Sequence, residues 1–269
     1  MRHLLIAAAL AAAPAVAAAT PTAWDNVAVQ LYGDRALLDG ADVIAIDAPY
    51  RSDMDARTRI AAEVAAPEGL RIGKVTLVLD ENPMPVSAVF ELDAPQERFF
   101  FDVTMRVNGP TPVHVVAETT DGRLFVAGTY VKTSGQGACA APPGTDPDKA
   151  LATLGDMVLT VEAGAGGTAA GRLAALGARQ SRLDVDISHP SHSGMQKDQI
   201  SLLFIPLRYV QDVAIDLDGA GYVDITGSIS LSENPRVSLS IPGGAQSVDV
   251  TMTDTDGTVS HASTRLPGF

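Results

Sequence analysis

Short apolar runs recur along the chain at intervals of roughly eight to twelve residues and are separated by Gly, Pro, Asn and Asp, a spacing typical of antiparallel β-sandwiches. Apolar and polar residues alternate most clearly from Lys74 to Leu79, the period of a strand that buries one face. Three consecutive phenylalanines, Phe99 to Phe101, must occupy both faces of a strand. The pattern predicts an all-β protein.

The same criteria predict comparable series of strands in the two halves of the chain. In the first half they are Asp42–Ile46, Arg57–Val64, Lys74–Leu79, Val86–Leu92, Phe99–Val107, Val113–Glu118 and Arg123–Val131. In the second half they are Met157–Val161, Arg182–Ile187, Ile200–Ile205, Val213–Leu217, Tyr222–Thr226, Val237–Ile241, Val248–Met252 and Val259–Thr264.

The composition changes between the two series. Residues 133–147 are rich in Gly and Ser and then contain Pro142-Pro143-Gly144. Asp146 followed by Pro147 is a favourable start for one short helix reaching Leu154. We therefore predict a flexible linker over 133–147, between a domain at 20–132 and a domain at 148–269.

Three short motifs occur twice in the same order and indicate that both halves share one topology. Glu-Asn-Pro occurs at 81–83 and 233–235, Asp-Val-Thr-Met at 102–105 and 249–252, and Asp-Gly at 121–122 and 256–257. Asp-Gly is a favoured hairpin turn.

Residues 1–19 predict a signal peptide. Arg2 and His3 form a short basic start, Leu4 to Ala13 form an apolar stretch too short to span a bilayer, and Ala17-Ala18-Ala19 offers a small-residue cleavage site. We therefore expect export, with a bacterial periplasm as the compartment and no membrane insertion of the mature chain.

The charge balance disfavours two classes of binding partner. The chain carries 32 acidic and 19 basic side chains, a formal net charge of −13. Nucleic acid and anionic membrane surfaces would repel such a protein. Asp80, Glu81, Asp254 and Asp256 are interpreted as turn carboxylates, because no pair is spaced for acid–base work.

Cys139 is the only cysteine, and it lies within the Gly-rich segment that precedes Pro142. A single cysteine in an exported protein forms no intrachain disulfide, so its thiol is free, joined to another molecule, or in use. Gly135 and Gly137 are expected to make the arm flexible, and the eight residues after Val131 could extend roughly 25 Å. We interpret Cys139 as a sulfur that other proteins reach; an idle linker cysteine is the alternative.

The sequence offers little for catalysis or metal binding. No histidine lies near Cys139, and no nucleophile elbow, P-loop or dinucleotide fingerprint occurs, so we expect neither an enzyme nor a cofactor. His189, His192 and Met195 could suit copper or zinc, which leaves a metal chaperone as one alternative. The preferred interpretation is no metal, with His189 bonding its own turn.

The first half resembles the SoxY subunit of the bacterial sulfur-oxidation carrier. The residues that carry this resemblance are Glu81-Asn82-Pro83-Met84-Pro85, Ala88-Val89-Phe90-Glu91-Leu92, Val113–Glu118, Gly122-Arg123-Leu124-Phe125 and the Gly-rich segment around Cys139. The second half resembles the SoxZ subunit through Ile187-Ser188-His189-Pro190, Ser193-Gly194-Met195-Gln196-Lys197-Asp198, Ile229–Pro235 and Asp249–Gly257.

As a whole the chain is similar to fused SoxYZ-like carriers associated with quinoprotein dehydrogenases. The resemblance implies two immunoglobulin-like antiparallel β-sandwich domains joined by a Gly/Pro-rich linker. It also implies that intermediates such as thiosulfate-derived sulfur ride on Cys139 and are processed by periplasmic sulfur or redox enzymes. Here alanines flank the cysteine where the relatives have glycines, and the arm is tethered at both ends. The rival interpretation is a non-covalent accessory module for a quinoprotein dehydrogenase.

Overall fold

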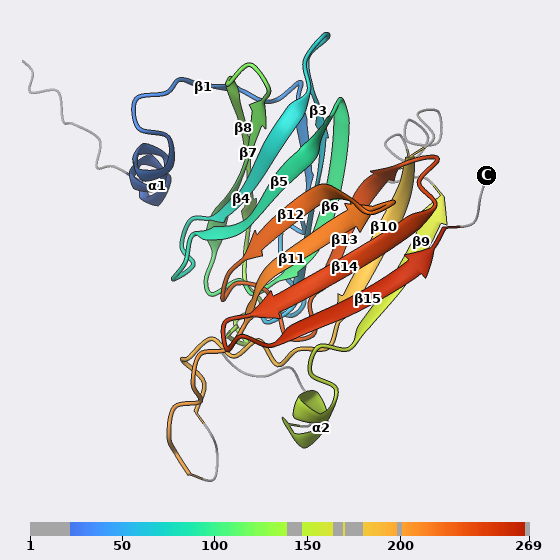
Figure 1. Ribbon diagram of the computed structural model, residues 1–269. Helices are drawn as coiled ribbons and strands as arrows, with labels where there is room; N and C mark the ends of the chain where they lie inside the picture. The colour runs from blue at the N-terminus through green and yellow to red at the C-terminus, as the bar shows by residue number, and fades with distance from the viewer. Residues whose placement is uncertain (1–21, 139–146, 164–168, 170–179, 198–200, 267–269) are drawn as a thin grey trace, which may run out of the picture.

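The computed structural model describes residues 22–138, 147–163, 169, 180–197 and 201–266. Over these residues the chain is all-β, with two packed sheets (Figure 1). The larger sheet contains, in spatial order, β1 (Leu37–Asp39), β8 (Leu124–Val131), β7 (Thr111–Thr119), β4 (Ile72–Leu79), β5 (Val86–Gln96), β12 (Ala220–Gly227), β11 (Val210–Leu217), β14 (Ser247–Asp254) and β15 (Val259–Arg265). The smaller sheet contains β2 (Ile44–Asp47), β3 (Thr58–Ala65), β6 (Arg98–Met105), β13 (Arg236–Pro242), β10 (Gln180–Ile187) and β9 (Met157–Ala163).

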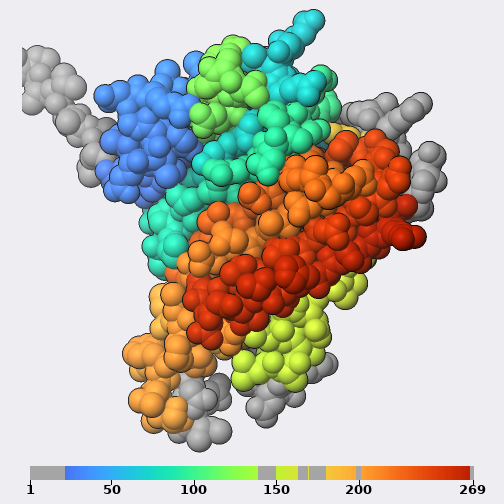
Figure 2. Space-filling view, in the orientation of Figure 1, coloured from blue at the N-terminus to red at the C-terminus, as the bar shows by residue number. Residues whose placement is uncertain are grey.

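The arrangement is consistent with two immunoglobulin-like sandwich domains, and both sheets continue from one half into the other. In the larger sheet β5 pairs with β12 antiparallel, with Phe90 opposite Ile225. In the smaller sheet β6 pairs with β13 antiparallel, with Phe101 opposite Leu239. The strands of the second half, orange to red, therefore lie directly against those of the first half (Figures 1 and 2).

The two halves share one strand order, as the sequence predicted. Outward from the join, the larger sheet runs β5, β4, β7, β8 on one side and β12, β11, β14, β15 on the other. The smaller sheet runs β6, β3, β2 and β13, β10, β9. The motifs that suggested this symmetry are mostly not equivalent, however: Asp102–Met105 lies in β6, whereas Asp249–Met252 lies in β14 of the other sheet. Only the two Asp-Gly turns occupy matching places.

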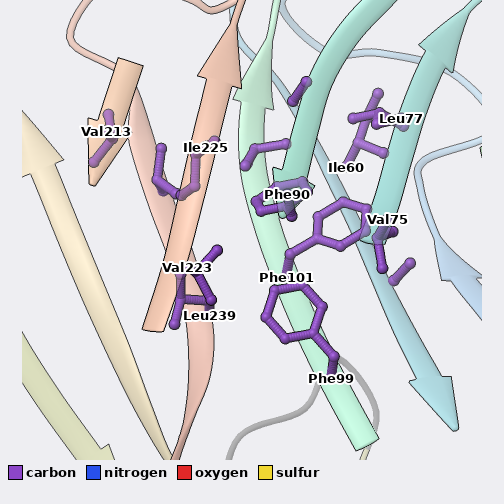
Figure 3. Close-up of a cluster of buried hydrophobic side chains, with 14 of the residues drawn as sticks. Ile60, Val75, Leu77, Phe90, Phe99, Phe101, Val213, Val223, Ile225 and Leu239 are labelled. Atoms are coloured by element: carbon purple, nitrogen blue, oxygen red, sulfur yellow. The ribbon is translucent and has the colours of Figure 1, made fainter. Parts of the chain in front are cut away.

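One hydrophobic core runs through both halves. Phe90 stacks on Phe101 with ring centroids 4.6 Å apart and meets the edge of Phe99 at 5.8 Å. Val223, Ile225 and Leu239 of the second half belong to the same buried cluster (Figure 3). Phe100 faces the other way, packs on Ala61 and lies under the Arg182 guanidinium, so the three phenylalanines do use both faces.

Three details differ from the predicted elements. Helix α1 (Ala23–Tyr32) was not predicted; Thr22 and Asp25 form its capping box, and Trp24 stacks on His114. Strand β1 was also missed, because it is only three residues long. The strand predicted over Ile200–Ile205 is wrong for the described residues 201–205, where Phe204 makes a single bridge to Lys197.

The short helix predicted to start at Asp146 and Pro147 is present as α2 (Pro147–Ala152). None of the helices among the described residues is long and apolar enough to cross a membrane.

Because the core is shared, we predict that Phe90→Ala destabilises the whole protein as one unit. Phe90 is fully buried, and such truncations cost about 3–5 kcal/mol. Denaturant titration followed by circular dichroism should show a single transition at lower denaturant. Val259→Ala, at an exposed position on β15, is the control and should change stability by less than about 0.5 kcal/mol. Two separate transitions in the Phe90 variant would show that the halves fold independently.

Candidate functional site

The stretch that leads from β8 to the cysteine, residues 132–139, is here called the cysteine segment. The structure describes it as far as Ala138, so Cys139 itself lies outside the described residues. The stretch that leads to it begins where β8 ends. Lys132 continues the strand as a parallel bridge to Arg51. The Ser52 amide donates to the Lys132 carbonyl at 2.8 Å, and the Lys132 amide donates to the Tyr50 carbonyl at 2.8 Å. The Arg51 guanidinium then donates to the Thr133 carbonyl at 2.9 Å. The loop between β2 and β3 therefore lines the start of the cysteine segment.

Asp55 in that loop binds residues 134–137 through their backbone amides. Its Oδ1 accepts the Ser134 amide at 2.6 Å, and its Oδ2 accepts the amides of Gly135, Gln136 and Gly137 at 3.0, 3.1 and 3.3 Å. The Asp55 side chain belongs to a buried residue, so the backbone amides replace the water that an exposed carboxylate would bind.

These contacts determine the charge state of Asp55. Burial alone would raise the pKa of the carboxyl, because it penalises the ionised form. The hydrogen bonds from Ser134, Gly135 and Gly137 outweigh this effect and lower the pKa below its ordinary value of 3.8. Asp55 is therefore ionised at neutral pH, and its interactions with the amides are charge-assisted.

The two glycines of the segment have a conformational task here. Gly135 and Gly137 have φ values of 91° and 83°, in the left-handed region that glycine adopts readily. These conformations turn successive amides toward one carboxylate. Residues 134–137 of the predicted linker hydrogen-bond the first half, and Ala138 is buried. Sequence composition does not reveal that an aspartate 79 residues away binds this stretch.

The loop that holds the segment also touches the second half. Arg57 donates to the Asn234 carbonyl at 2.8 Å. Asn234 in turn accepts the His189 amide on its side-chain oxygen at 3.0 Å and donates its own amide to the His189 carbonyl at 2.8 Å. The cysteine segment therefore starts beside the junction of the two halves.

His189, His192 and Met195 lie in different surroundings. His189 is fully buried; its Nδ1 accepts the Ser191 amide at 2.9 Å, which confirms the interpretation that it bonds its own turn. His192 pairs instead with Gln196 at 2.9 Å, and Met195 is exposed. Within the described ranges, no three His, Cys, Asp or Glu side chains are grouped so that they could hold a metal ion.

The turn carboxylates have structural partners. Asp80 lies 2.9 Å from Nδ1 of His114. Asp254 is buried and accepts Arg208 at 2.7 Å together with the amides of Asp256 and Thr258 at 2.9 and 2.8 Å. Asp254 therefore closes the turn after β14, whereas Asp80, in the turn after β4, contacts the neighbouring strand β7. Both positions agree with the interpretation of these aspartates as turn carboxylates.

Comparison with protein-family models gives two matches. Residues 28–139 match SoxY, sulfur oxidation protein SoxY, and residues 174–265 match SoxZ, sulphur oxidation protein SoxZ. The first match ends at Cys139. The second begins after β9, although β9 pairs along its whole length with β10 and so belongs to the second half of the structure. No curated protein matches the sequence.

The burial of His189 predicts a specific pH dependence of stability. Burial is the main cause that lowers the pKa of His189 to about 4, while Asp254 opposes the shift. In the unfolded chain the imidazole has its ordinary pKa of 6.5, so stability is lost as the pH falls from that value toward 4. Between about pH 7.5 and pH 5, this group should lower the free energy of unfolding by about 2 kcal/mol.

Denaturant titrations at the two pH values test this expectation. His189→Gln should remove that part of the pH dependence, whatever it does to stability at neutral pH. His261→Gln on the exposed face of edge strand β15 is the matched control and should keep the wild-type slope. An unchanged slope in the His189 variant would contradict the assignment.

Proposed function

The chain joins a SoxY-like and a SoxZ-like domain in one polypeptide, which supports a fused SoxYZ-like sulfur carrier, and we propose that its cargo is bound covalently to Cys139. The observation that carries this proposal is that the SoxY match reaches its end at the only cysteine of the chain. The resemblance to SoxY implies a carrier cysteine near the end of the SoxY-like part. Cys139 is the residue of this chain that corresponds to it.

The chemistry of attachment requires a partner. Joining the Cys139 sulfur to a sulfur atom of an anionic cargo such as thiosulfate forms an S–S bond and releases two electrons and the thiol proton. An electron-accepting partner, a haem protein or a quinoprotein dehydrogenase, takes the electrons, and the proton passes to solvent. In a mixed disulfide, the Cys139 thiolate instead attacks a disulfide of the partner; the displaced thiolate takes up a proton, and no external oxidant is needed.

The carrier itself performs none of these steps. SoxY and SoxZ are carrier or accessory proteins, and such carriers act with sulfur-oxidation enzymes as partners. The basic-then-apolar pattern of residues 1–19 supports export to the periplasm, where these partners operate. Residues 1–21 lie outside the described part of the chain, so this element of the proposal rests on the sequence.

The geometry beside the junction supports the proposal in a specific way. The segment that leads to Cys139 is anchored to the first half and lies next to contacts with the second half. A thiol held in a defined position can be oriented toward the reacting group of a partner, which favours reaction.

We predict that Cys139→Ser abolishes carrier activity while the fold remains intact. The hydroxyl replaces the thiol at similar size but forms no thiolate and no S–S bond. In a strain that lacks its own copy of the gene, the variant should reduce thiosulfate-dependent oxygen uptake to the level of the empty strain, with an unchanged circular dichroism spectrum.

A thiol moved elsewhere provides the control. Cys139→Ser combined with Ser263→Cys places one thiol on the exposed face of β15, away from the cysteine segment, and should not restore uptake. Full uptake with Cys139→Ser alone would reject the covalent carrier and favour a non-covalent accessory module.

A further inference from the structure

We propose that Asp55 is a positioning residue of the carrier. The hydrogen bonds between its carboxylate and residues 134–137, here called the latch, hold these residues on the first half, so that the chain continues toward Cys139 from a fixed point beside the junction. The use of the latch rests on the proposed carrier function, whereas its existence does not. The sequence did not point to Asp55, which lies in a loop and belongs to no recognisable motif.

The hydrogen bonds to Asp55 are unusual in number and direction. Four successive backbone amides converge on one carboxylate at distances from 2.6 to 3.3 Å. Successive amides turned to one side form a cradle for an anion, of the kind that binds phosphate or other ligands in many proteins. Here a side chain of the same protein occupies the cradle. The segment is therefore bound as a ligand would be, by a group that belongs to the rigid part of the fold.

Asp55 is itself fixed to the first half and cannot move with residues 134–137. Its carbonyl accepts the Val107 amide at 2.8 Å, at the end of β6. The loop around it is closed by a hydrogen bond of 2.7 Å between the hydroxyls of Ser52 and Thr58. The fixed side of the latch thus belongs to the first half, and the side that can move away is the cysteine segment.

The latch also limits how far the chain before Cys139 can extend. The eight residues from Val131 to Cys139 would extend roughly 25 Å if they were free. With the latch closed, residues 132–137 follow the protein surface, and Ala138, the residue immediately before the cysteine, is buried. A closed latch therefore removes residues 132–138 from the length of chain that can extend. Opening the latch lengthens the arm and exposes four amides to water.

The test uses Asp55→Asn in the full-length mature protein. The amide side chain keeps the size of the carboxylate but loses its charge and half of its acceptor capacity. Hydrogen exchange at residues 134–137 should become at least about tenfold faster, because bonds to a charged acceptor are the stronger class. The amide proton resonances of Gly135 and Gly137 should move upfield, while amides in β7 stay unchanged.

The reactivity of Cys139 gives a second readout that general destabilisation does not reproduce. We compare alkylation by N-ethylmaleimide with alkylation by a maleimide carrying a polyethylene glycol chain of about 5 kDa. A bulky reagent depends on arm length more than a small one, so Asp55→Asn should raise the ratio of the bulky to the small rate at least about threefold. Asp102→Asn is the control: Asp102 is also buried, but its partners are Arg59 and Arg182, and the ratio should stay at the wild-type value.

A second pair of variants avoids any change in the core. Gly137→Ala strains the latch from the side of the segment, because alanine disfavours a φ of 83°, and its new methyl group would meet no atom within 4 Å. Gly69→Ala introduces the same strain, at a φ of 77° in a turn between β3 and β4 and equally without a clash. Only the first should speed exchange at residues 134–136 and raise the alkylation ratio.

The outcomes separate this proposal from the carrier function. Wild-type exchange and alkylation in both Asp55→Asn and Gly137→Ala would overturn the latch, even if Cys139 carries cargo. Faster exchange at residues 134–137 with a raised alkylation ratio supports the latch, even if Cys139→Ser shows that no cargo is carried. Thiosulfate-dependent oxygen uptake that is fully retained in an Asp55→Asn protein with an open latch would overturn the claim that the latch positions the cysteine for its partners.

Discussion

The pairing of β5 with β12 and of β6 with β13 is the constraint on which the rest of the structure depends. These two ladders make both sheets continuous, and the phenylalanines at the join give the halves one core. Two domains linked only by a segment of chain would move independently. Here the loop that binds residues 134–137 is also hydrogen-bonded to Asn234 of the second half.

The strands were largely predictable, because a strand with one buried face leaves a period of two in the sequence. The continuity of the sheets was not, since an edge strand that pairs within its own half and one that pairs with the other half carry the same pattern. Phe90 and Ile225 are ordinary core residues in sequence, and only the structure shows them opposite each other. The apolar run at 200–205 also resembles a strand, yet the described part of it makes a single bridge.

The residues of the candidate site were also only partly predictable from the sequence. Cys139 stood out because a single cysteine in a Gly-rich segment is conspicuous by composition alone. Asp55 could not be found, because a carboxylate that binds backbone amides needs no particular side chain opposite it and therefore leaves no pattern. Gly135 and Gly137 were expected to make the arm flexible; both also have positive φ values, a conformation that glycine adopts readily. The same residue type serves both purposes, and only the hydrogen-bond partner distinguishes them.

The central claim is that Cys139 carries a covalently bound sulfur species, and the mass of the intact protein tests it most directly. The protein is purified without reductant from its native cells, grown with reduced sulfur compounds, and its intact mass is measured before and after treatment with a thiol reductant. The account predicts a reducible mass increase that maps to Cys139 and identifies the cargo. An unmodified thiol in every preparation would contradict it.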